Sequence, residues 1–344
     1  MQPYDHGGNV YGGPRPRVDF SVNVNPLGMP PQVVEALSPD PAADARYPDP
    51  ACRALRQALS IRFSIPTKNI LCGNGSADLL MRICAALRPK NVLLPAPTFS
   101  EYARCVRLFG GTVKEYTLSE NDGFAITESF LQAVTPDTDM VFLCYPNNPT
   151  GRLCPPELVA KLADRCRDTD CYLVIDECFL PFTDGVSALP LLAGHPKLLV
   201  LRAFTKIYAM AGLRLGVLLG NDALLDRIAP YGAQWSVSTV AQRCGIAALT
   251  NEDWIPQTRQ YIRQQRQRMA NALTACGLTV YPSDANFLLL RAPIPLAEPL
   301  QQRGLWVRKC NNFTGLDDRF IRVGIQNPAE NDLLIQSIQE VLHG

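Results

Sequence analysis

The stretch Met140-Val-Phe-Leu-Cys-Tyr-Pro-Asn-Asn-Pro-Thr-Gly151 places a continuous apolar run directly before a polar turn. An apolar run bounded by turn residues is typical of a strand that is buried on both faces. The amides of Asn147 and Asn148 then follow the carboxyl end of that strand, where α/β folds place ligand groups. An ordinary turn is the competing interpretation, because Pro, Asn and Gly are common in turns.

Short apolar runs of the same kind recur at 91–95, 172–176, 198–202 and 215–219. Helical patterns lie between the runs, at 76–87, 99–109 and 156–167. Apolar strands that alternate with helices predict an α/β fold with a mostly parallel central sheet, sandwiched by helices.

The pattern changes in the last third of the chain. A long polar helix is predicted over 253–276, with Gly277 as its stop signal, and a final amphipathic helix over 331–342. Strand-like segments at 287–291 and 320–324 lie between them. We therefore expect a second, smaller α+β domain.

Three regions follow from these patterns. Residues 46–235 form the expected large domain, and residues 236–344 form the C-terminal small domain. Residues 1–45 are rich in Gly, Pro and Asn but include a strand-like alternation at 19–24, so we expect an arm that joins the small domain.

Charge and hydropathy narrow the class of protein. The 344 residues carry 33 Lys and Arg against 32 Asp and Glu, and this balance argues against a nucleic-acid partner. No apolar run approaches the roughly 18 residues of a membrane helix, and the first residues do not resemble a secretory signal. A soluble cytoplasmic protein without a membrane partner is expected.

The 12 cysteines form no CxxC pair and lie mostly in apolar runs. Buried, reduced thiols are the favoured interpretation, and a disulfide or metal framework is the alternative. The chain has three histidines, which makes a His-rich metal site hard to build, so no metal is predicted.

Three further motifs carry chemistry. Gly73-Asn-Gly-Ser76-Ala77 opens a helix after a strand, where backbone N–H groups attract a phosphate, although a tight turn gives the same pattern. Asp176 ends an apolar strand and needs a cation or donor there, either in a site or in a structural ion pair. Thr205-Lys206 follows another strand, and Arg214 comes eight residues later.

An isolated Lys206 would be read as a solvated surface residue. A lysine among other cations, however, has a lowered pKa and can form a Schiff base. A phosphate cradle, an acid for a pyridine nitrogen, an amide for a phenolic oxygen and a lysine together meet the needs of pyridoxal 5′-phosphate (PLP). We take these four motifs as one site.

In these motifs the sequence resembles the fold-type-I PLP enzymes of the class I/II aminotransferase superfamily, over nearly the whole chain. The resemblance implies that Lys206 is the Schiff-base lysine and a catalytic residue, together with Asp176, the partner of the pyridine nitrogen. It also implies that Arg322 binds the substrate α-carboxylate. The further cofactor-binding residues that it implies are Gly75, Ser76, Ala77, Phe99, Asn148, Thr205 and Arg214.

Tyr47 matches the tyrosine that reaches the phosphate of a neighbouring subunit, which implies a homodimer with shared active sites. Two positions depart from the pattern. Phe179 stands where many relatives carry a tyrosine that bonds the cofactor's 3′-oxygen, and Ala203 stands where many carry a serine that contacts the phosphate.

The N-terminal segment His6-Gly-Gly-Asn9, with Asn25 further on, resembles the threonine-phosphate decarboxylases of cobalamin biosynthesis. This resemblance implies decarboxylation of L-threonine O-3-phosphate or a close analogue such as O-phosphoserine. Arg308 would bind the phosphate of this phosphorylated amino-acid substrate, with help from His6, Asn9 and Asn25. A flexible terminal turn is the competing interpretation of His6-Gly-Gly-Asn9.

Three alternative functions stay open. A histidinol-phosphate aminotransferase, or another class I/II aminotransferase, shares the core motifs and a phosphorylated substrate. A PLP-binding scaffold without catalysis would also keep the cofactor residues. A nucleotide-binding dehydrogenase would need GxGxxG after its first strand, and Gly73-Asn-Gly75 lacks the third glycine.

Overall fold

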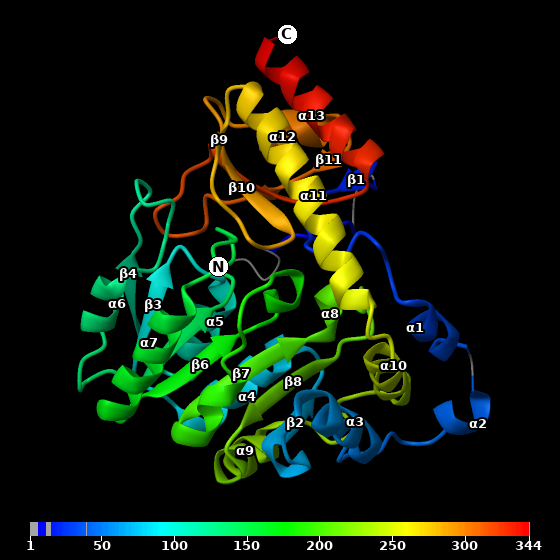
Figure 1. The fold of residues 1–344 in the computed structure, drawn as a ribbon, viewed down its shortest axis with the longest axis vertical. Coiled ribbons are helices and arrows are strands. Elements are labelled where there is room, and N and C mark those ends of the chain that lie inside the picture. The colour runs from blue at the N-terminus through cyan, green and yellow to red at the C-terminus, as the bar shows by residue number, and fades with distance from the viewer. Residues whose placement is uncertain (1–5, 12–14, 39, 344) are drawn as a thin grey trace.

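A seven-stranded sheet forms the lower part of the molecule in the computed structural model, which describes residues 6–11, 15–38 and 40–343 (Figure 1). Its strand order is β2-β8-β7-β6-β5-β3-β4, and β8 alone among the seven runs against the others. The strands are β2 (Ile70–Gly73), β3 (Asn91–Ala96), β4 (Thr112–Thr117), β5 (Met140–Cys144), β6 (Tyr172–Asp176), β7 (Leu198–Ala203) and β8 (Gly216–Gly220).

Helices cover both faces of this sheet because its strands are apolar at successive residues, which point to opposite faces. On one face, Phe142 packs in a cluster with side chains of α4, α5 and α9, whereas on the other Val141 packs with side chains of α3, α7 and α10. These helices are α3 (Arg53–Phe63), α4 (Ser76–Leu87), α5 (Ser100–Leu108), α7 (Pro156–Asp168), α9 (Asp222–Ile228) and α10 (Thr239–Leu249).

A second, four-stranded sheet lies above the first in Figure 1, in the antiparallel order β12-β13-β10-β9. Beside it, β1 pairs in parallel with β11. The strands are β1 (Val18–Asp19), β9 (Thr279–Val280), β10 (Phe287–Arg291), β11 (Leu305–Trp306), β12 (Arg308–Lys309) and β13 (Phe320–Gly324). The remaining helices are α1 (Pro31–Ala36), α2 (Pro41–Asp44), α6 (Glu128–Gln132), α8 (Phe204–Ile207), α11 (Trp254–Ala275), α12 (Ala297–Gln302) and α13 (Pro328–His343).

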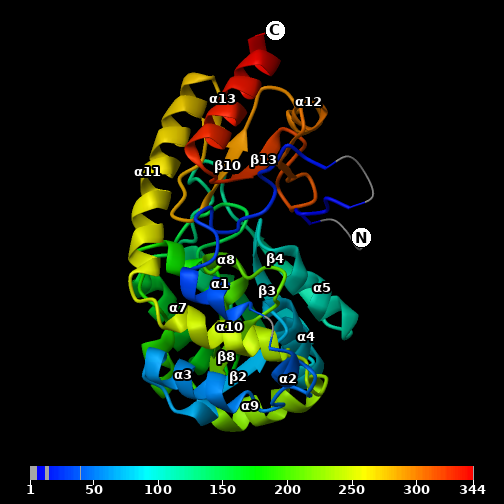
Figure 2. The same ribbon diagram turned by 90° about the vertical axis from the view of Figure 1, so that its right-hand side faces the viewer.

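The helix α11 links the two sheets along one side of the molecule, as Figure 2 shows. It lies against α13 and β9 of the upper part and against the short helix Leu180–Phe182 of the lower part. The N-terminal segment also bridges the two parts, because β1 pairs with β11 and α1 packs against α10. The domain division 1–45, 46–235 and 236–344 stays a prediction, to which the structure adds that α10 packs on α3 and α1.

Most of the predicted elements are confirmed. The structure has the strand at Met140–Cys144, the helix at Ser76–Leu87 and the strand at Phe320–Gly324 as expected. All 12 cysteines are free and buried, as the apolar runs around them indicate.

Two local expectations differ from the structure. The segment expected as a strand at 215–219 is indeed β8, but it is antiparallel to both of its neighbours. The strand expected over 19–24 ends at Asp19, because the Asp19 carboxylate accepts hydrogen bonds from the backbone N–H and the hydroxyl of Ser21 and turns the chain there.

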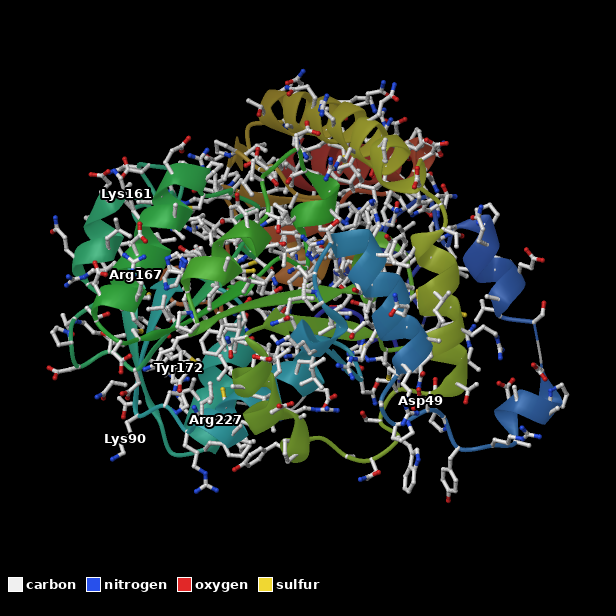
Figure 3. The ribbon with its side chains drawn as sticks, turned by 60° about the horizontal axis from the view of Figure 1, so that its bottom comes forward. Asp49, Lys90, Lys161, Arg167, Tyr172 and Arg227 are labelled. Carbon is white, nitrogen blue, oxygen red and sulfur yellow. The ribbon has the colours of Figure 1, made fainter. Side chains whose placement is uncertain are left out.

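The base of the large sheet faces the viewer in Figure 3. Tyr172, the first residue of β6, lies there, and its hydroxyl accepts a hydrogen bond from Arg227 of α9 at 3.1 Å. The carboxyl end of β6, at Asp176, is therefore at the other end of the sheet, toward the upper sheet. Among the described residues, no helix is long and apolar enough to cross a membrane.

Candidate active site

A cavity of about 210 Å³ opens where the carboxyl ends of the central strands meet the upper sheet. Asn148 follows β5, Asp176 ends β6 and Lys206 follows β7, and all three line the cavity. Arg308 of β12 and Arg322 of β13 line it from the upper sheet. The fold thus joins Asn148 and Arg322, which are 174 residues apart in sequence.

The cavity brings most of the predicted site residues together. Those among its lining are His6, Ser76, Ala77, Phe99, Asn148, Asp176, Thr205, Lys206, Arg214, Arg308 and Arg322. Gly75 lies next to this lining, whereas Tyr47, Asn9 and Asn25 are outside it.

Asp176 is held as a hydrogen-bond acceptor inside the fold. Its side chain is buried, the Tyr102 hydroxyl donates to Oδ2 at 2.7 Å, and the backbone N–H of Cys178 donates to Oδ1 at 3.0 Å. Burial raises the pKa of Asp176, and these donors act in the opposite direction. A cation placed beside this carboxylate, such as a protonated ring nitrogen, would gain a strong buried interaction.

Lys206 lies in electropositive, poorly hydrated surroundings. Desolvation lowers the pKa of its ammonium group, and the nearby guanidinium groups of Arg322 and Arg214 lower it further. A lysine with a lowered pKa carries more neutral amine, which is the nucleophilic form. The arrangement suits Lys206 for covalent chemistry and for proton transfer.

The turn before α4 is shaped to receive an anion. Gly75 has φ of +80°, and a Cβ atom there would lie 2.5 Å from Nη2 of Arg214. A Cβ atom on Gly216 would lie 2.5 Å from the carbonyl carbon of Gly75. The two glycines therefore permit the close approach that brings Arg214 to the N-terminus of a 12-residue helix, where backbone N–H groups and the helix dipole favour negative charge.

Arg322 is buried with part of its guanidinium group unused. One Nη donates to Oδ1 of Asn148, the other donates to the carbonyl of Ser21 at 2.7 Å, and Nε has no hydrogen-bond partner among the described residues. Burial lowers the pKa of Arg322 to about 10, so the group is still charged at neutral pH. A buried cation with an open donor suits a carboxylate ligand.

Arg308 stands directly opposite Arg322 in the register of β12 and β13. It is buried, its guanidinium group lies 5.1 Å from the ring centroid of Phe313, and Nη2 donates to Oδ1 of Asn312 at 2.9 Å. Two buried guanidinium groups on adjacent strands thus face one cavity, which suits a ligand with two anionic groups.

Several lining residues were not predicted from the sequence, and the predicted Asn25 lies outside the lining. Ser21 and Asn23 line the cavity, and Oδ1 of Asn23 is buried without a hydrogen-bond partner among the described residues. The side-chain amide of Asn25 instead donates hydrogen bonds to the carbonyl of Ile207 and the hydroxyl of Thr258. We therefore do not propose Asn25 as a substrate ligand. Cys144, Cys178, Phe179 and Phe313 also line the cavity.

Tyr47 lies on the surface, away from the cavity of its own chain. Its side chain is 79% exposed, and its ring stacks on that of Trp235 with centroids 4.6 Å apart. A subunit-bridging role for Tyr47 therefore requires a second chain.

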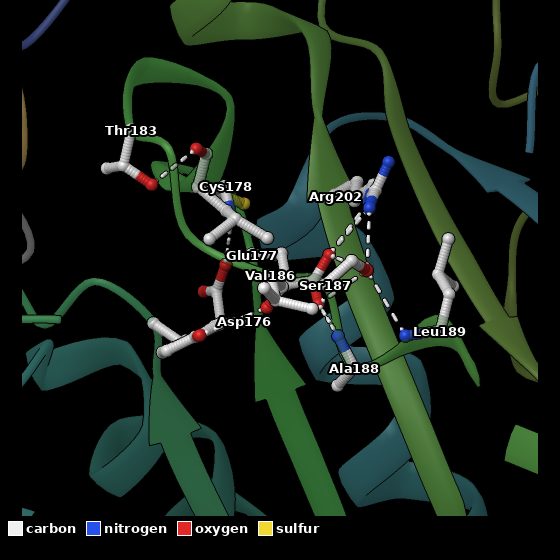
Figure 4. A network of polar contacts seen from close by, with 11 residues as sticks. Asp176, Glu177, Cys178, Thr183, Val186, Ser187, Ala188, Leu189 and Arg202 are labelled. Carbon is white, nitrogen blue, oxygen red and sulfur yellow. Dashed lines mark hydrogen bonds and ion pairs between the residues drawn. The ribbon is translucent and has the colours of Figure 1, made fainter. Parts of the chain in front are cut away.

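Glu177, the residue after Asp176, has a structural role. It is fully buried, and Figure 4 shows it between the guanidinium group of Arg202 and the loop that holds Ser187. Arg202 donates to Oε2 at 2.7 Å, and the backbone N–H of Ala188 donates to Oε1 at 2.6 Å. This ion pair ties the end of β6 to β7 and so fixes the strand ends that carry Asp176 and, three residues after β7, Lys206.

Comparisons with known proteins assign the family. Residues 15–338 match the family described as aminotransferase class I and II. The threonine-phosphate decarboxylase of Salmonella typhimurium is 38% identical over 98% of this chain and 97% of its own length. The chain therefore belongs to the class I and II aminotransferase family.

Solved structures show the same architecture. The L-threonine-O-3-phosphate decarboxylase of Porphyromonas gingivalis is 27% identical, covers 94% of this chain and 99% of its own, and has a TM-score of 0.83. The histidinol-phosphate aminotransferase of Sinorhizobium meliloti, solved in complex with pyridoxal-5′-phosphate, is 25% identical with a TM-score of 0.86, over 93% of this chain and 89% of its own. The predicted fold type I is confirmed.

Proposed function

We propose that this chain is a PLP-dependent enzyme that decarboxylates L-threonine O-3-phosphate to an amino-alcohol phosphate. The observation that carries the proposal is the pair Arg308 and Arg322, because a carboxylate and a phosphate on one small substrate match two buried guanidinium groups in one cavity. The 38% identity to a threonine-phosphate decarboxylase supports it.

The residues of the cavity fit the cofactor. The turn of Gly75 with Arg214 suits its phosphate, Asp176 suits a protonated ring nitrogen, and Asn148 suits its phenolic oxygen. Phe99 offers a ring face from the start of α5. When bound, the cofactor supplies an electron sink for the bond that breaks at the substrate Cα.

The protein's part in the reaction is to bind, orient and move a proton. Arg322 would bind the carboxylate and Arg308 the phosphate, and these two anchors would fix how the bonds at the substrate Cα are oriented in the cavity. Asp176 holds a proton at the ring nitrogen. Lys206 would hold the cofactor through its amine, and its Nζ would supply the proton that replaces the departing carbon dioxide at Cα.

We also propose a homodimer with shared sites, a cytoplasmic location and a place in cobalamin biosynthesis. The exposed, stacked pair of Tyr47 and Trp235 supports the dimer, since large aromatic side chains are enriched at interfaces. The 12 free thiols support a reducing compartment. Sedimentation of the holoprotein at the mass of one chain, 37.9 kDa, would contradict the dimer.

The experiment that tests the proposed reaction is a product assay. The holoprotein is incubated with L-threonine O-3-phosphate without a keto acid, and release of carbon dioxide is followed. Steady release over many turnovers is expected. Lys206→Ala protein is the matched blank, because it keeps the cavity but loses the amine.

A histidinol-phosphate aminotransferase is the second candidate, supported by the structural similarity to the Sinorhizobium meliloti enzyme. Histidinol phosphate carries a phosphate but no carboxylate. Its phosphate would engage Arg308, and the carboxylate of the amino-acid co-substrate would engage Arg322 in the other half of the reaction. Glutamate formed from histidinol phosphate and 2-oxoglutarate, without carbon dioxide from phosphothreonine, would favour this candidate.

Arg308→Ala is expected to raise KM for L-threonine O-3-phosphate about tenfold to a hundredfold, because a hydrogen bond to a charged group is worth about 1.5–3 kcal/mol. The KM for unphosphorylated L-threonine should change much less. Arg319→Ala is the control, since Arg319 immediately precedes β13, the strand that pairs with β12, but is bonded to Asp317. Equal effects of Arg308→Ala on both substrates would remove Arg308 from the phosphate site.

Gly75→Ala is expected to weaken cofactor binding about tenfold or more. A non-glycine residue at positive φ costs about 1–3 kcal/mol, and the new Cβ would also displace Arg214. Titration of the apoprotein with PLP measures the effect. Gly194→Ala is the control, because a Cβ there meets nothing within 4 Å. The same affinity in both variants would contradict the phosphate cradle.

A further inference from the structure

The N-terminal strap, residues 6–10, contributes His6 and Gly7 to the lining of the cavity and is fixed at two points. At the first point, Gly8 N–H donates to the hydroxyl of Ser21 at 2.8 Å. Gly7 packs so closely that a Cβ there would lie 2.1 Å from the Ser21 carbonyl oxygen. That carbonyl also accepts the hydrogen bond from Arg322, so the strap rests on the residue that orients the carboxylate-binding arginine.

The second point joins the strap to α5. Nε2 of His6 lies 2.8 Å from Oε1 of Glu101, and the His6 ring lies 5.8 Å from the ring of Phe99. Glu101 is in the first turn of α5, where a carboxylate is favoured by the helix dipole. Its side chain is 12% exposed, against 41% for His6. The better-buried Glu101 is therefore the anchor, and His6 is the group that it holds.

The charge on Glu101 fixes the orientation of the imidazole. The hydrogen bond from His6 holds the pKa of Glu101 below its ordinary value, and Arg104 acts in the same direction. An ionised carboxylate accepts and does not donate, so Nε2 of His6 carries the proton in this contact. Nδ1 is then the ring nitrogen that Glu101 does not engage.

His6 and Arg308 line the same cavity, whereas Glu101 does not. We propose that Glu101 is a positioning residue for substrate recognition: it holds His6, and with it the N-terminal strap, over the part of the cavity that receives the substrate's phosphate. The inference rests on the proposed function in naming that phosphate. The contact between strap and α5 stands independently of it.

Two consequences distinguish this role from a merely stabilising ion pair. Loss of Glu101 should weaken binding of a phosphorylated amino acid and leave binding of the unphosphorylated one nearly unchanged. The effects of losing His6 and of losing Glu101 on the binding free energy should also not add, because both changes remove the same contact.

The binding experiment uses the holoenzyme and the change in its visible absorbance on adding L-threonine O-3-phosphate or L-threonine. Glu101→Ala and His6→Ala are each expected to raise Kd for the phosphorylated ligand about tenfold. The double variant should bind about as weakly as either single one. The Kd of Glu101→Gln for the phosphorylated ligand should lie between those of wild type and Glu101→Ala, because the glutamine amide oxygen still accepts a hydrogen bond but carries no charge.

Arg104→Ala is the matched control, since Arg104 bonds the other carboxylate oxygen of Glu101 at 3.0 Å from the exposed side of α5. It should leave both Kd values within about twofold of wild type. Unchanged phosphothreonine binding in Glu101→Ala, or effects of His6 and Glu101 that multiply in the double variant, would overturn the proposal.

Hydrogen exchange of the strap separates this proposal from the proposed reaction. Exchange at the amides of Gly8 and Val10, which are hydrogen-bonded in the structure, should rise several-fold in Glu101→Ala but not in Arg104→Ala. Absence of that rise overturns the anchoring role even if phosphothreonine is decarboxylated. Absence of carbon dioxide release overturns the reaction and leaves the exchange and binding measurements valid.

Discussion

Lys206→Ala is expected to lower the turnover of the holoenzyme by at least about a thousandfold, because positioned proton transfer alone contributes about 10²–10⁴-fold and the covalent hold on the cofactor is lost as well. The visible absorbance of the bound cofactor should also change, since the amine that captures it is gone. Both quantities are measured on protein loaded with PLP, the turnover with L-threonine O-3-phosphate as substrate.

Lys197→Ala is the control for this variant. Lys197 also lies beside β7, but its ammonium group pairs with Asp170 at the other end of the strand from the cavity. Its turnover should equal that of wild type. A Lys206→Ala protein that turned over at the wild-type rate would refute the assignment of Lys206.

The lowered pKa of Lys206 should be visible in the pH dependence of cofactor capture by the apoprotein. The neutral amine captures the cofactor aldehyde, and its fraction rises with pH, so the rate of capture by the apoprotein should rise with pH. Because the pKa of Lys206 is lowered, the rise should be centred below the ordinary lysine value of about 10.4. Arg322→Gln removes one nearby cation and should move the midpoint upward.

The fold was predictable wherever the pattern is local. The run 140–144 is apolar at every position because β5 is covered on both faces, and 76–87 is amphipathic because α4 lies on the sheet. The four core motifs were predictable for a related reason. Each follows a strand, and parallel strands bring their carboxyl ends to one edge.

Contacts that depend on the path of a loop were not predictable in this way. Asn23 and Asn25 share the parity of one strand face, but the chain turns after Asp19, and Asn23 alone of the two reaches the cavity. The contact between His6 and Glu101 joins residues 95 apart, and nothing in either local sequence specifies it. The register that sets Arg308 opposite Arg322 is a property of the paired strands.

Asp176→Asn is expected to lower kcat/KM about a hundredfold to several thousandfold. The asparagine keeps the size of the side chain but removes the buried negative charge that we propose holds a proton at the cofactor's ring nitrogen, and loss of one partner of a buried charge pair costs about 3–5 kcal/mol. Cofactor affinity should fall less than turnover, because the proposed phosphate cradle of Gly75, Ser76 and Arg214 is unchanged.

Tyr102→Phe is expected to have a smaller effect on kcat/KM than Asp176→Asn. It removes the hydroxyl that donates to Asp176 at 2.7 Å but leaves the carboxylate, so a loss of about tenfold is expected, which corresponds to one hydrogen bond to a charged group. Asp222→Asn is the control, because Asp222 pairs with Lys68 on the surface. If Asp176→Asn lost no more activity than Tyr102→Phe, the charge of Asp176 would not act on the ring nitrogen, and its role would reduce to hydrogen bonding within the fold.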